Sequence, residues 1–321
     1  MSAGKRATQP HVTVIIPTLN SRTIGQTLAA VRGQRYDMGR VEVLVVGLDP
    51  HHLVQEDELV RFIATEGPVS AARARNLGLA QARGNIICFT DDDCVPALDW
   101  LEKLLGPYQT AGVSVVGGGM SLPGHGYWAQ CDAVTSAYEQ LVFQPAGPRR
   151  QLPSLNFSIR RELLAQFNGF SESFPKAAGE DSHLSARLRQ AGHTLWFSPE
   201  AVVEHIGWRT TGRTVLAHAH LFGQYTVWLH PDMQAFIRPP FFFGHWLLMV
   251  LATPPLAGWI TGRMFLRQRR MLRYWLLLPG IYLAQVAWGL GVTRTLWRRQ
   301  KNTAAQPKAV QLEISEKIKK P

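Results

Sequence analysis

The sequence predicts an α/β fold in which a mostly parallel β-sheet carries helices on both faces. Apolar runs at 12–16, 42–46 and 59–64 have the length and composition of short buried strands. A helix is expected from Ser21 to Gly33, between the first two runs, with Ser21 as its N-cap. This order of strand, helix and strand is the unit from which parallel sheets are built.

The same alternation continues along the chain. Helices are expected at 70–83 and 99–109, and strands at 86–89 and 113–116. The glycine-rich stretch 117–126 is expected to be a loop. Because no G-x-G-x-x-G pattern follows the first strand, a dinucleotide-binding site of that kind is disfavoured.

Composition narrows the class of protein. With 321 residues and 46% hydrophobic content the chain can bury a large core, which excludes a disordered protein. Its net charge of +11 suits nucleic acid, an anionic membrane surface or phosphorylated substrates. Cys88, Cys94 and Cys131 show neither metal-ligand spacing nor a disulfide framework, so a reducing compartment is expected. The polar first ten residues lack the apolar run of a secretory signal.

Three consecutive carboxylates follow the strand expected at 86–89. In an open α/β sheet, ligands bind beyond the carboxyl ends of the strands, which is where Asp91 and Asp93 should lie. Two carboxylates separated by one residue suit Mg²⁺ or Mn²⁺, ions that also take phosphate oxygens as ligands. The alternative is a solvated acidic turn without a ligand.

Several separated motifs support the interpretation of Asp91 and Asp93 as ligands of a metal ion. They are, in chain order, Val12 to Asn20, Glu42 to Val46, Gly67 to Gly78, Gly84 to Pro96 and Gly179 to Gly192. In this order and spacing the chain resembles the family 2 glycosyltransferases, which have the GT-A fold. The resemblance covers roughly residues 11 to 210.

The resemblance implies a binding site for a nucleoside-diphosphate sugar, with UDP favoured. Family members carry an acidic pair directly after the second strand; here Asp49 stands at a shifted position and is expected to contact the base. Arg75 is expected beside the diphosphate, with a solvated basic helix face as the alternative. The implied donor-binding residues are Pro17, Thr18, Asn20, Asp49, Glu66, Arg75, Asn76, Asp91 and Asp92.

The resemblance also implies the chemistry. Asp91, Asp93 and His205 are expected to hold Mn²⁺ or Mg²⁺, and Asp181 to be the catalytic base of an inverting transferase. Glu180 and Asn156 are expected on the acceptor side. Asp181 could instead serve only as a carboxylate at a helix start.

The last third of the chain has a different character. Two uncharged stretches, Phe241 to Gly262 and Tyr274 to Thr293, flank an arginine-rich link at 263–273. Two full membrane spans would place this link across the membrane from the catalytic domain, against the usual distribution of Arg and Lys. Re-entrant or interfacial helices on an anionic membrane surface are therefore favoured, and a buried helical pair is the alternative. Seven of the ten tryptophans lie at or after Trp208, which favours interfacial anchoring.

The expected organisation is a disordered start (1–10), a GT-A domain (11–235), a membrane-associated helical region (236–301) and a disordered tail (302–321). The expected function is transfer of a single sugar to a lipid or lipid-linked acceptor at the cytosolic face of the inner membrane, in cell-envelope biogenesis. At 224–228 the chain resembles the Gln-x-x-Arg-Trp signature of processive polysaccharide synthases, but Val227 replaces the arginine. Transfer of one sugar per encounter is therefore favoured over processive polymerisation. Nucleic-acid binding is disfavoured because the basic residues gather around the apolar stretches. The alternatives are a transferase for a soluble acceptor that is only tethered to the membrane, and a catalytically silent, membrane-docked protein of the same fold.

Overall fold

A computed structural model describes residues 11–110, 112–174 and 178–318, with side chains as far as Asn302. The expected disordered start, and the last three residues of the expected tail, lie outside this range. The chain divides into two compact units: unit 1 comprises residues 1–126 and 136–208, and unit 2 comprises 127–135 and 209–321. Unit 1 therefore ends earlier than the domain predicted at 11–235.

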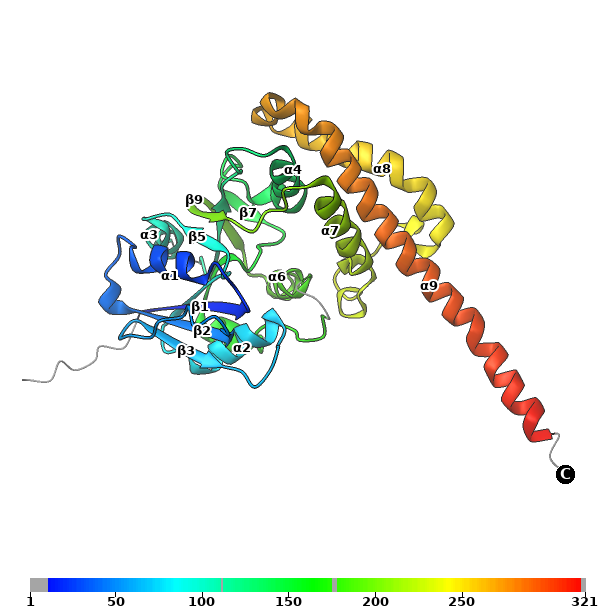
Figure 1. The fold of residues 1–321 in the computed structure, drawn as a ribbon, viewed down its shortest axis with the longest axis horizontal. Helices are drawn as coiled ribbons and strands as arrows, with labels where there is room; N and C mark the ends of the chain where they lie inside the picture. The colour runs from blue at the N-terminus through cyan, green and yellow to red at the C-terminus, as the bar shows by residue number, and fades with distance from the viewer. Residues whose placement is uncertain (1–10, 111, 175–177, 319–321) are drawn as a thin grey trace, which may run out of the picture. The chain divides into compact units, whose positions relative to one another are not determined.

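Unit 1 is built on one nine-stranded sheet in the order β3-β2-β1-β4-β8-β6-β9-β5, with β7 also paired to β9 (Figure 1). The first four of these strands are parallel, whereas β8 runs antiparallel to both β4 and β6. The sheet is thus more mixed than predicted. Its strands are β1 (Val12–Leu19), β2 (Val41–Leu48), β3 (Val60–Ala64), β4 (Ile86–Thr90), β5 (Cys94–Pro96), β6 (Val115–Met120), β7 (Gly147–Arg149), β8 (Asn156–Arg160) and β9 (Leu195–His205).

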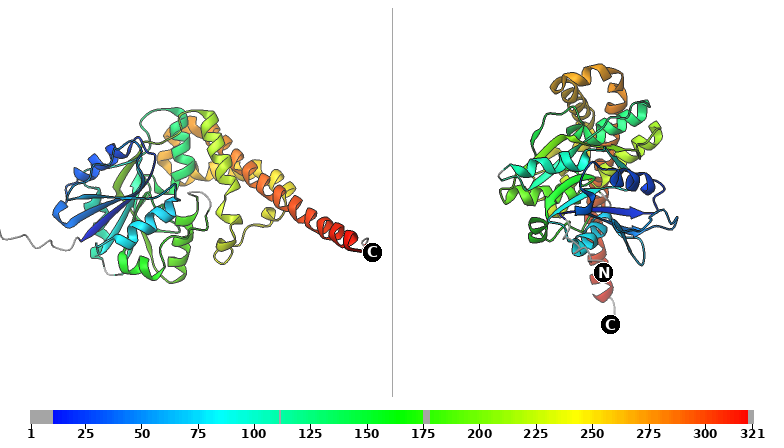
Figure 2. Two further views of the ribbon diagram at one scale, coloured as in Figure 1. Left: turned by 60° about the horizontal axis from the view of Figure 1, so that its bottom comes forward. Right: turned by 90° about the vertical axis from the view of Figure 1, so that its left-hand side faces the viewer.

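Two hydrophobic cores lie on opposite faces of this sheet, because side chains alternate along each strand. Helices α1 (Ile24–Arg32) and α3 (Trp100–Leu105) cover one face, where they meet Val14, Ile16 and Val43. Helices α2 (Ala71–Gln81), α5 (Arg161–Gln166) and α6 (Glu180–Gln190) cover the other, where they meet Ile15 and Leu44. Figure 2 shows the sheet with α1 on one side and α2 on the other. The prediction of helices on both faces is confirmed.

Two local predictions need correction. Helix α1 begins at Ile24 with Thr23 as its N-cap residue, and not at Ser21 as expected. The Ser21 hydroxyl still accepts the N–H groups of Thr23 and Ile24, at 3.1 and 3.2 Å. The expected loop at 117–126 is strand as far as Met120. A side chain at Gly118 would collide with the Ala201 carbonyl and the Asn156 amide, so glycine there permits two neighbouring strands to approach closely.

Unit 2 is helical. It contains most of α4 (Tyr127–Ala137), then α7 (Gly212–Gln224), α8 (Trp246–Arg267) and α9 (Leu278–Ile318). Short 3₁₀ turns lie at Val227–Leu229, Pro231–Met233, Phe241–Gly244 and Arg269–Leu277, the last labelled η7. Helices α7 and α9 cross closely, because Gly223 faces the Trp288 carbonyl and Gly291 faces that of His220. The expected tail from 302 is helical to Ile318, in a segment rich in Ala, Gln, Glu and Lys, which favour helix.

By length and composition, one stretch of the described residues is apolar enough to cross a membrane, Arg269–Asn302, and half of its apolar window is buried inside the protein. The other apolar stretch forms α8, which contains Pro254 and Pro255 without ending there.

Candidate active site

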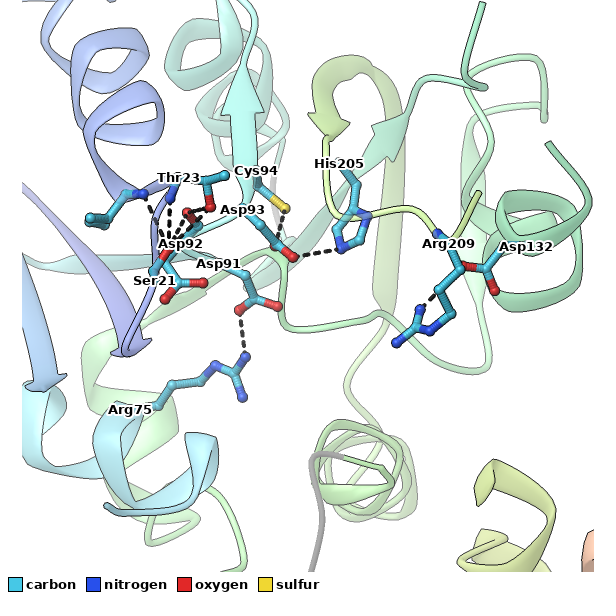
Figure 3. Close-up of polar contacts among 11 residues, drawn as sticks. Ser21, Thr23, Arg75, Asp91, Asp92, Asp93, Cys94, Asp132, His205 and Arg209 are labelled. Carbon is cyan, nitrogen blue, oxygen red and sulfur yellow. Dashed lines mark hydrogen bonds and ion pairs between the residues drawn. The ribbon is translucent and has the colours of Figure 1, made fainter. Parts of the chain in front are cut away.

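The carboxylate run lies directly after β4, at the edge of the sheet where β1 and β2 also end. The three residues have different partners (Figure 3). Asp91 Oδ1 accepts a hydrogen bond from Arg75 Nη2 at 2.7 Å, and Asp93 Oδ2 lies 3.2 Å from His205 Nε2. The backbone carbonyl of Asp92 accepts hydrogen bonds from the hydroxyls of Ser21 and Thr23. The run is therefore a fixed part of the site and not a freely solvated turn.

The carboxyl groups of Asp92 and Asp93 have pKa values that are shifted in opposite directions. Burial raises the pKa of Asp92 to about 6, and the two neighbouring carboxylates act in the same direction. Burial alone would also raise the pKa of Asp93, but its contact with the His205 imidazole brings that pKa below the ordinary value. The contact with His205 thus favours the ionised form of Asp93.

The residues expected to hold a cation are brought together only in part. Asp93 and His205 are in contact, and the Nδ1 atom of His205 is buried without a partner in the described part of the chain. Asp91 instead faces Arg75. Among the described residues, no three His, Cys, Asp or Glu side chains are grouped closely enough to hold a metal ion. The donor types fit a divalent cation, but a third protein ligand is not in place.

Arg75 occupies a buried position on α2. Its guanidinium donates to Asp91 and, through Nη1, to Glu180 Oε1 at 3.2 Å, and its side chain is only 3% exposed. The expected contact with diphosphate is therefore not open to it in this arrangement. Burial, reinforced by the charge of Asp181, raises the pKa of Glu180 to about 7.

Asp181 stands in the first turn of α6, after Gly179, whose φ of 119° favours glycine. Its carboxylate accepts the Ser182 N–H at 2.7 Å and the Ser154 N–H at 3.4 Å. Burial raises the pKa of Asp181, while these N–H groups and the charge of Arg75 oppose the increase. A carboxylate with a raised pKa next to a cation is suited to accepting a proton near neutral pH.

A cavity of about 750 Å³ opens beyond the ends of β1 and β2. Asp49 Oδ2 accepts the Val54 N–H at 2.7 Å, whereas Asp49 Oδ1 is buried with no partner in the described residues. A buried acceptor without a donor is costly, so it points to an absent ligand group. The cavity is lined by Leu19, Asn20, Leu48, Asp49, Pro50, His51 and Pro68.

Four of these lining residues, Leu48, Pro50, His51 and Pro68, were not predicted from the sequence. Leu48, Pro50 and His51 lie at or just after the end of β2, and Pro68 precedes α2. The rule that ligands bind beyond the carboxyl ends of parallel strands would have identified the first three.

Four other residues predicted to bind the donor have different surroundings. Pro17 and Thr18 are buried within β1, and Glu66 is an exposed residue after β3. The Asn76 amide donates to the Phe170 carbonyl and to Glu172, and its oxygen accepts the Phe170 N–H. A nucleotide contact by Asn76 would require these bonds to break.

Asn156 is likewise not placed for an acceptor contact. It is 0% exposed, its Oδ1 accepts from Trp100 Nε1 at 2.8 Å, and its Nδ2 donates to the carbonyls of Gly119 and Ala201 at 2.9 and 2.8 Å. These bonds connect α3, β6, β8 and β9. The prediction that Asn156 contacts the acceptor is therefore corrected. Both amide protons and one lone pair of the amide oxygen are already used inside the core.

Comparison with known proteins agrees with this geometry. The family described as "Glycosyl transferase family 2" matches residues 13–159. The glycosyltransferase AglE of Haloferax volcanii is 28% identical over 261 residues, which cover 78% of this chain and 84% of that protein. The pre-mycofactocin glycosyltransferase of Mycobacterium tuberculosis is 29% identical over 70% of this chain, which spans about half (49%) of that relative.

Solved structures show the same fold. The mannosyltransferase PcManGT from Pyrobaculum calidifontis, in complex with GDP-Man and Mn²⁺, aligns with a TM-score of 0.57 at 20% identity, over 91% of this chain and 88% of that one. GalNAc-T7 with UDP, GalNAc and Mn²⁺ aligns with a TM-score of 0.51 at 17% identity, over 70% and 49%. Given the carboxylate run, the cavity and these likenesses, residues 13–159 match glycosyltransferase family 2, and the chain has the GT-A fold.

Proposed function

We propose that this enzyme is an inverting transferase that moves one sugar from a UDP-sugar to a hydroxyl of a lipid or lipid-linked acceptor. The observation that carries the proposal is that two carboxylates, Asp91 after β4 and Glu180 at the start of α6, meet on the buried Arg75. Asp91 belongs to the donor side, and Glu180, next to Asp181, belongs to the acceptor side. Transfer requires both sides to meet at one anomeric carbon.

The preference for uridine rests on Asp49. Its Oδ2 accepts the Val54 N–H, whereas Oδ1 is buried without a partner among the described residues, so Oδ1 is the oxygen best placed to accept a hydrogen bond from the base. Uracil offers one N–H on its pairing edge, whereas guanine offers two adjacent donors that would use both oxygens of a carboxylate. The walls of the cavity include Leu19 and Pro68, which suit the faces of a pyrimidine ring.

In the proposed reaction, Asp181 removes the proton from the acceptor hydroxyl. The resulting oxygen attacks the anomeric carbon from the side opposite the diphosphate, the bond from that carbon to the phosphate oxygen breaks, and UDP leaves with the electron pair. Asp93 and His205, joined by Asp91, would hold a divalent cation. When bound, such a cation neutralises diphosphate charge.

The acceptor class and the location are inferred from unit 2. Leu251 and Trp259 on α8 are 73% and 59% exposed, and Trp275 and Leu276 on η7 are 61% and 63% exposed. Arginines lie among them, and Arg263 stacks 4.9 Å over the Trp259 ring. Exposed apolar side chains mixed with arginine suit the anionic headgroup region at the cytosolic face of the inner membrane. A transferase held there meets lipid-linked hydroxyls.

The function is tested by nucleoside diphosphate release from a panel of UDP- and GDP-sugars, with Mn²⁺ and with or without lipid-extract vesicles. We expect turnover with a UDP-sugar that the vesicles stimulate, and a loss of about 100-fold to 10,000-fold in Asp181→Asn. Glu162→Gln, an exposed carboxylate in the first turn of α5, is the matched control and should keep the wild-type rate. Full activity in Asp181→Asn would refute the assigned base.

Membrane attachment is tested by sedimentation with vesicles. Wild type should bind phosphatidylglycerol vesicles more tightly than phosphatidylcholine vesicles, and binding should weaken as salt is raised. Trp275→Ser with Leu276→Ser should reduce binding, whereas Leu98→Ser, an equally apolar and 53% exposed position in unit 1, should not. Equal binding by all three proteins would contradict the proposed membrane face.

A further inference from the structure

Arg75 joins two parts of the chain that are far apart in sequence. Asp91 follows β4, and Glu180 begins α6, 105 residues beyond Arg75. The side chains of Arg75 and Glu180 are 3% and 5% exposed, so neither is placed to contact a large substrate directly. The Phe170 ring lies 5.6 Å from the guanidinium carbon and covers it. Figure 3 shows Arg75 reaching toward Asp91 from below the carboxylate run.

A purely structural ion pair does not account for all of these contacts. Glu180 Oε2 is buried and has no hydrogen-bond partner in the described residues, and the same holds for Arg75 Nε. Buried ion pairs with unsatisfied atoms stabilise a fold poorly, and apolar side chains of similar size often do as well or better. The Arg75–Glu180 pair therefore has a role beyond stabilising the fold.

The charges around Asp181 suggest what that use is. Arg75 on α2 is the cation that faces it, Asp91 after β4 and Glu180 on α6 are the neighbouring carboxylates, and His183 lies two residues further along α6. Without Arg75, three carboxylates would face one another in a poorly solvated space. Their mutual repulsion would favour protonation of Asp181, the state in which it cannot accept a proton.

We propose that Arg75 is a positioning residue: through Glu180 it holds the start of α6, and with it Asp181, against the donor-side Asp91. Arg75 itself touches neither the sugar nor the acceptor. Because one guanidinium binds both carboxylates, the geometry of the donor side is transmitted to the base on the acceptor side. This inference rests on the proposed function, since it assigns Asp181 as the base.

The test is the pH dependence of kcat/KM for UDP-sugar turnover in wild type, Arg75→Met, Arg75→Lys and Glu180→Gln. Arg75→Met should lower kcat by about 100-fold, the effect of a small misplacement of reacting groups. The acid limb of its pH profile, the part where kcat/KM falls as Asp181 becomes protonated, should move to higher pH, because a positive charge near Asp181 is lost. Glu180→Gln should move that limb to lower pH, because a negative charge is lost. Arg75→Lys keeps the charge but loses the two-armed contact, so kcat should fall while the limb stays in place.

Each outcome decides the matter. Opposite movements of the acid limb in Arg75→Met and Glu180→Gln, with the UDP-induced increase in melting temperature preserved, support the inference. Activity that falls with an unmoved limb would show a merely structural pair and overturn it. If Arg75→Met does not fold, Glu180→Gln and Arg75→Lys decide: a limb that moves to lower pH in Glu180→Gln, with a lower kcat and an unmoved limb in Arg75→Lys, supports the inference, and an unmoved limb in Glu180→Gln overturns it. A wild type that turns over no nucleotide-sugar would overturn the proposed function, a failure distinct from an active wild type whose variants keep its pH profile.

Discussion

Replacing Asn156 by alanine should destabilise unit 1 strongly. The amide is fully buried, and three buried groups would lose their partner: the Trp100 indole N–H and the carbonyls of Gly119 and Ala201. Each unsatisfied buried group costs about 1–3 kcal/mol. Local relaxation recovers part of the total, so the expected loss in the free energy of unfolding is about 3 kcal/mol, the low end of the sum for three such groups.

Urea unfolding followed by tryptophan fluorescence measures this loss, and Trp100 itself lies at the altered site. Asn85→Ala is the matched control, because Asn85 is an exposed asparagine just before β4. Its stability should stay within about 0.5 kcal/mol of wild type. If Asn156→Ala keeps wild-type stability but loses acceptor affinity, then Asn156 contacts the acceptor and our reasoning about its role is wrong.

Three further predictions concern the same edge of the sheet. With EDTA present, Asp92→Asn should raise the melting temperature at pH 7.5 but little at pH 4. The pKa of Asp92 in the folded protein, about 6, lies above its value in the unfolded chain. The stabilising contribution of the protonated carboxyl is therefore present at low pH and lost as pH rises through 6. An equal effect at both pH values would contradict this. Gly118→Ala should cost about 1–3 kcal/mol through overpacking against Ala201, measured by urea unfolding, while Gly124→Ala, which has open space around it, should cost far less. His205→Ala should raise the Mn²⁺ concentration for half-maximal turnover about 10-fold or more; an unchanged metal titration would remove His205 from the cation site.

Much of unit 1 could be predicted from sequence because local pattern and final structure agree there. The strands at 12–16, 42–46, 59–64 and 86–89 and the helix starting after Ser70 all appear near their expected places. Each combines an apolar run with a turn or cap signal, and the Ser70 hydroxyl does accept the Arg73 N–H. The strand at Gly117–Met120 was missed because its glycines are selected by the close approach of β9, a tertiary constraint with no local signal.

The candidate site shows the same division. The sequence correctly predicts that the run after β4 lies at a strand end, and it identifies Asp49, which lines the cavity. It does not predict that Arg75 is buried between Asp91 and Glu180, because that contact joins residues 105 positions apart. Asn76 and Asn156 were assigned to ligands for a related reason: their motifs mark positions near the site, but the backbone groups that occupy both amides come from other segments.

The central claim is a cation-dependent uridine nucleotide site at the ends of β1, β2 and β4. The most direct measurement is the change in melting temperature produced by UDP and GDP, each with Mn²⁺ or EDTA, in wild type, Asp49→Ala and Asp93→Asn. We predict stabilisation of wild type by UDP with Mn²⁺, its loss with EDTA or in Asp93→Asn, and loss of the preference for UDP over GDP in Asp49→Ala. Equal or absent stabilisation by both nucleotides, with and without Mn²⁺, would contradict the account.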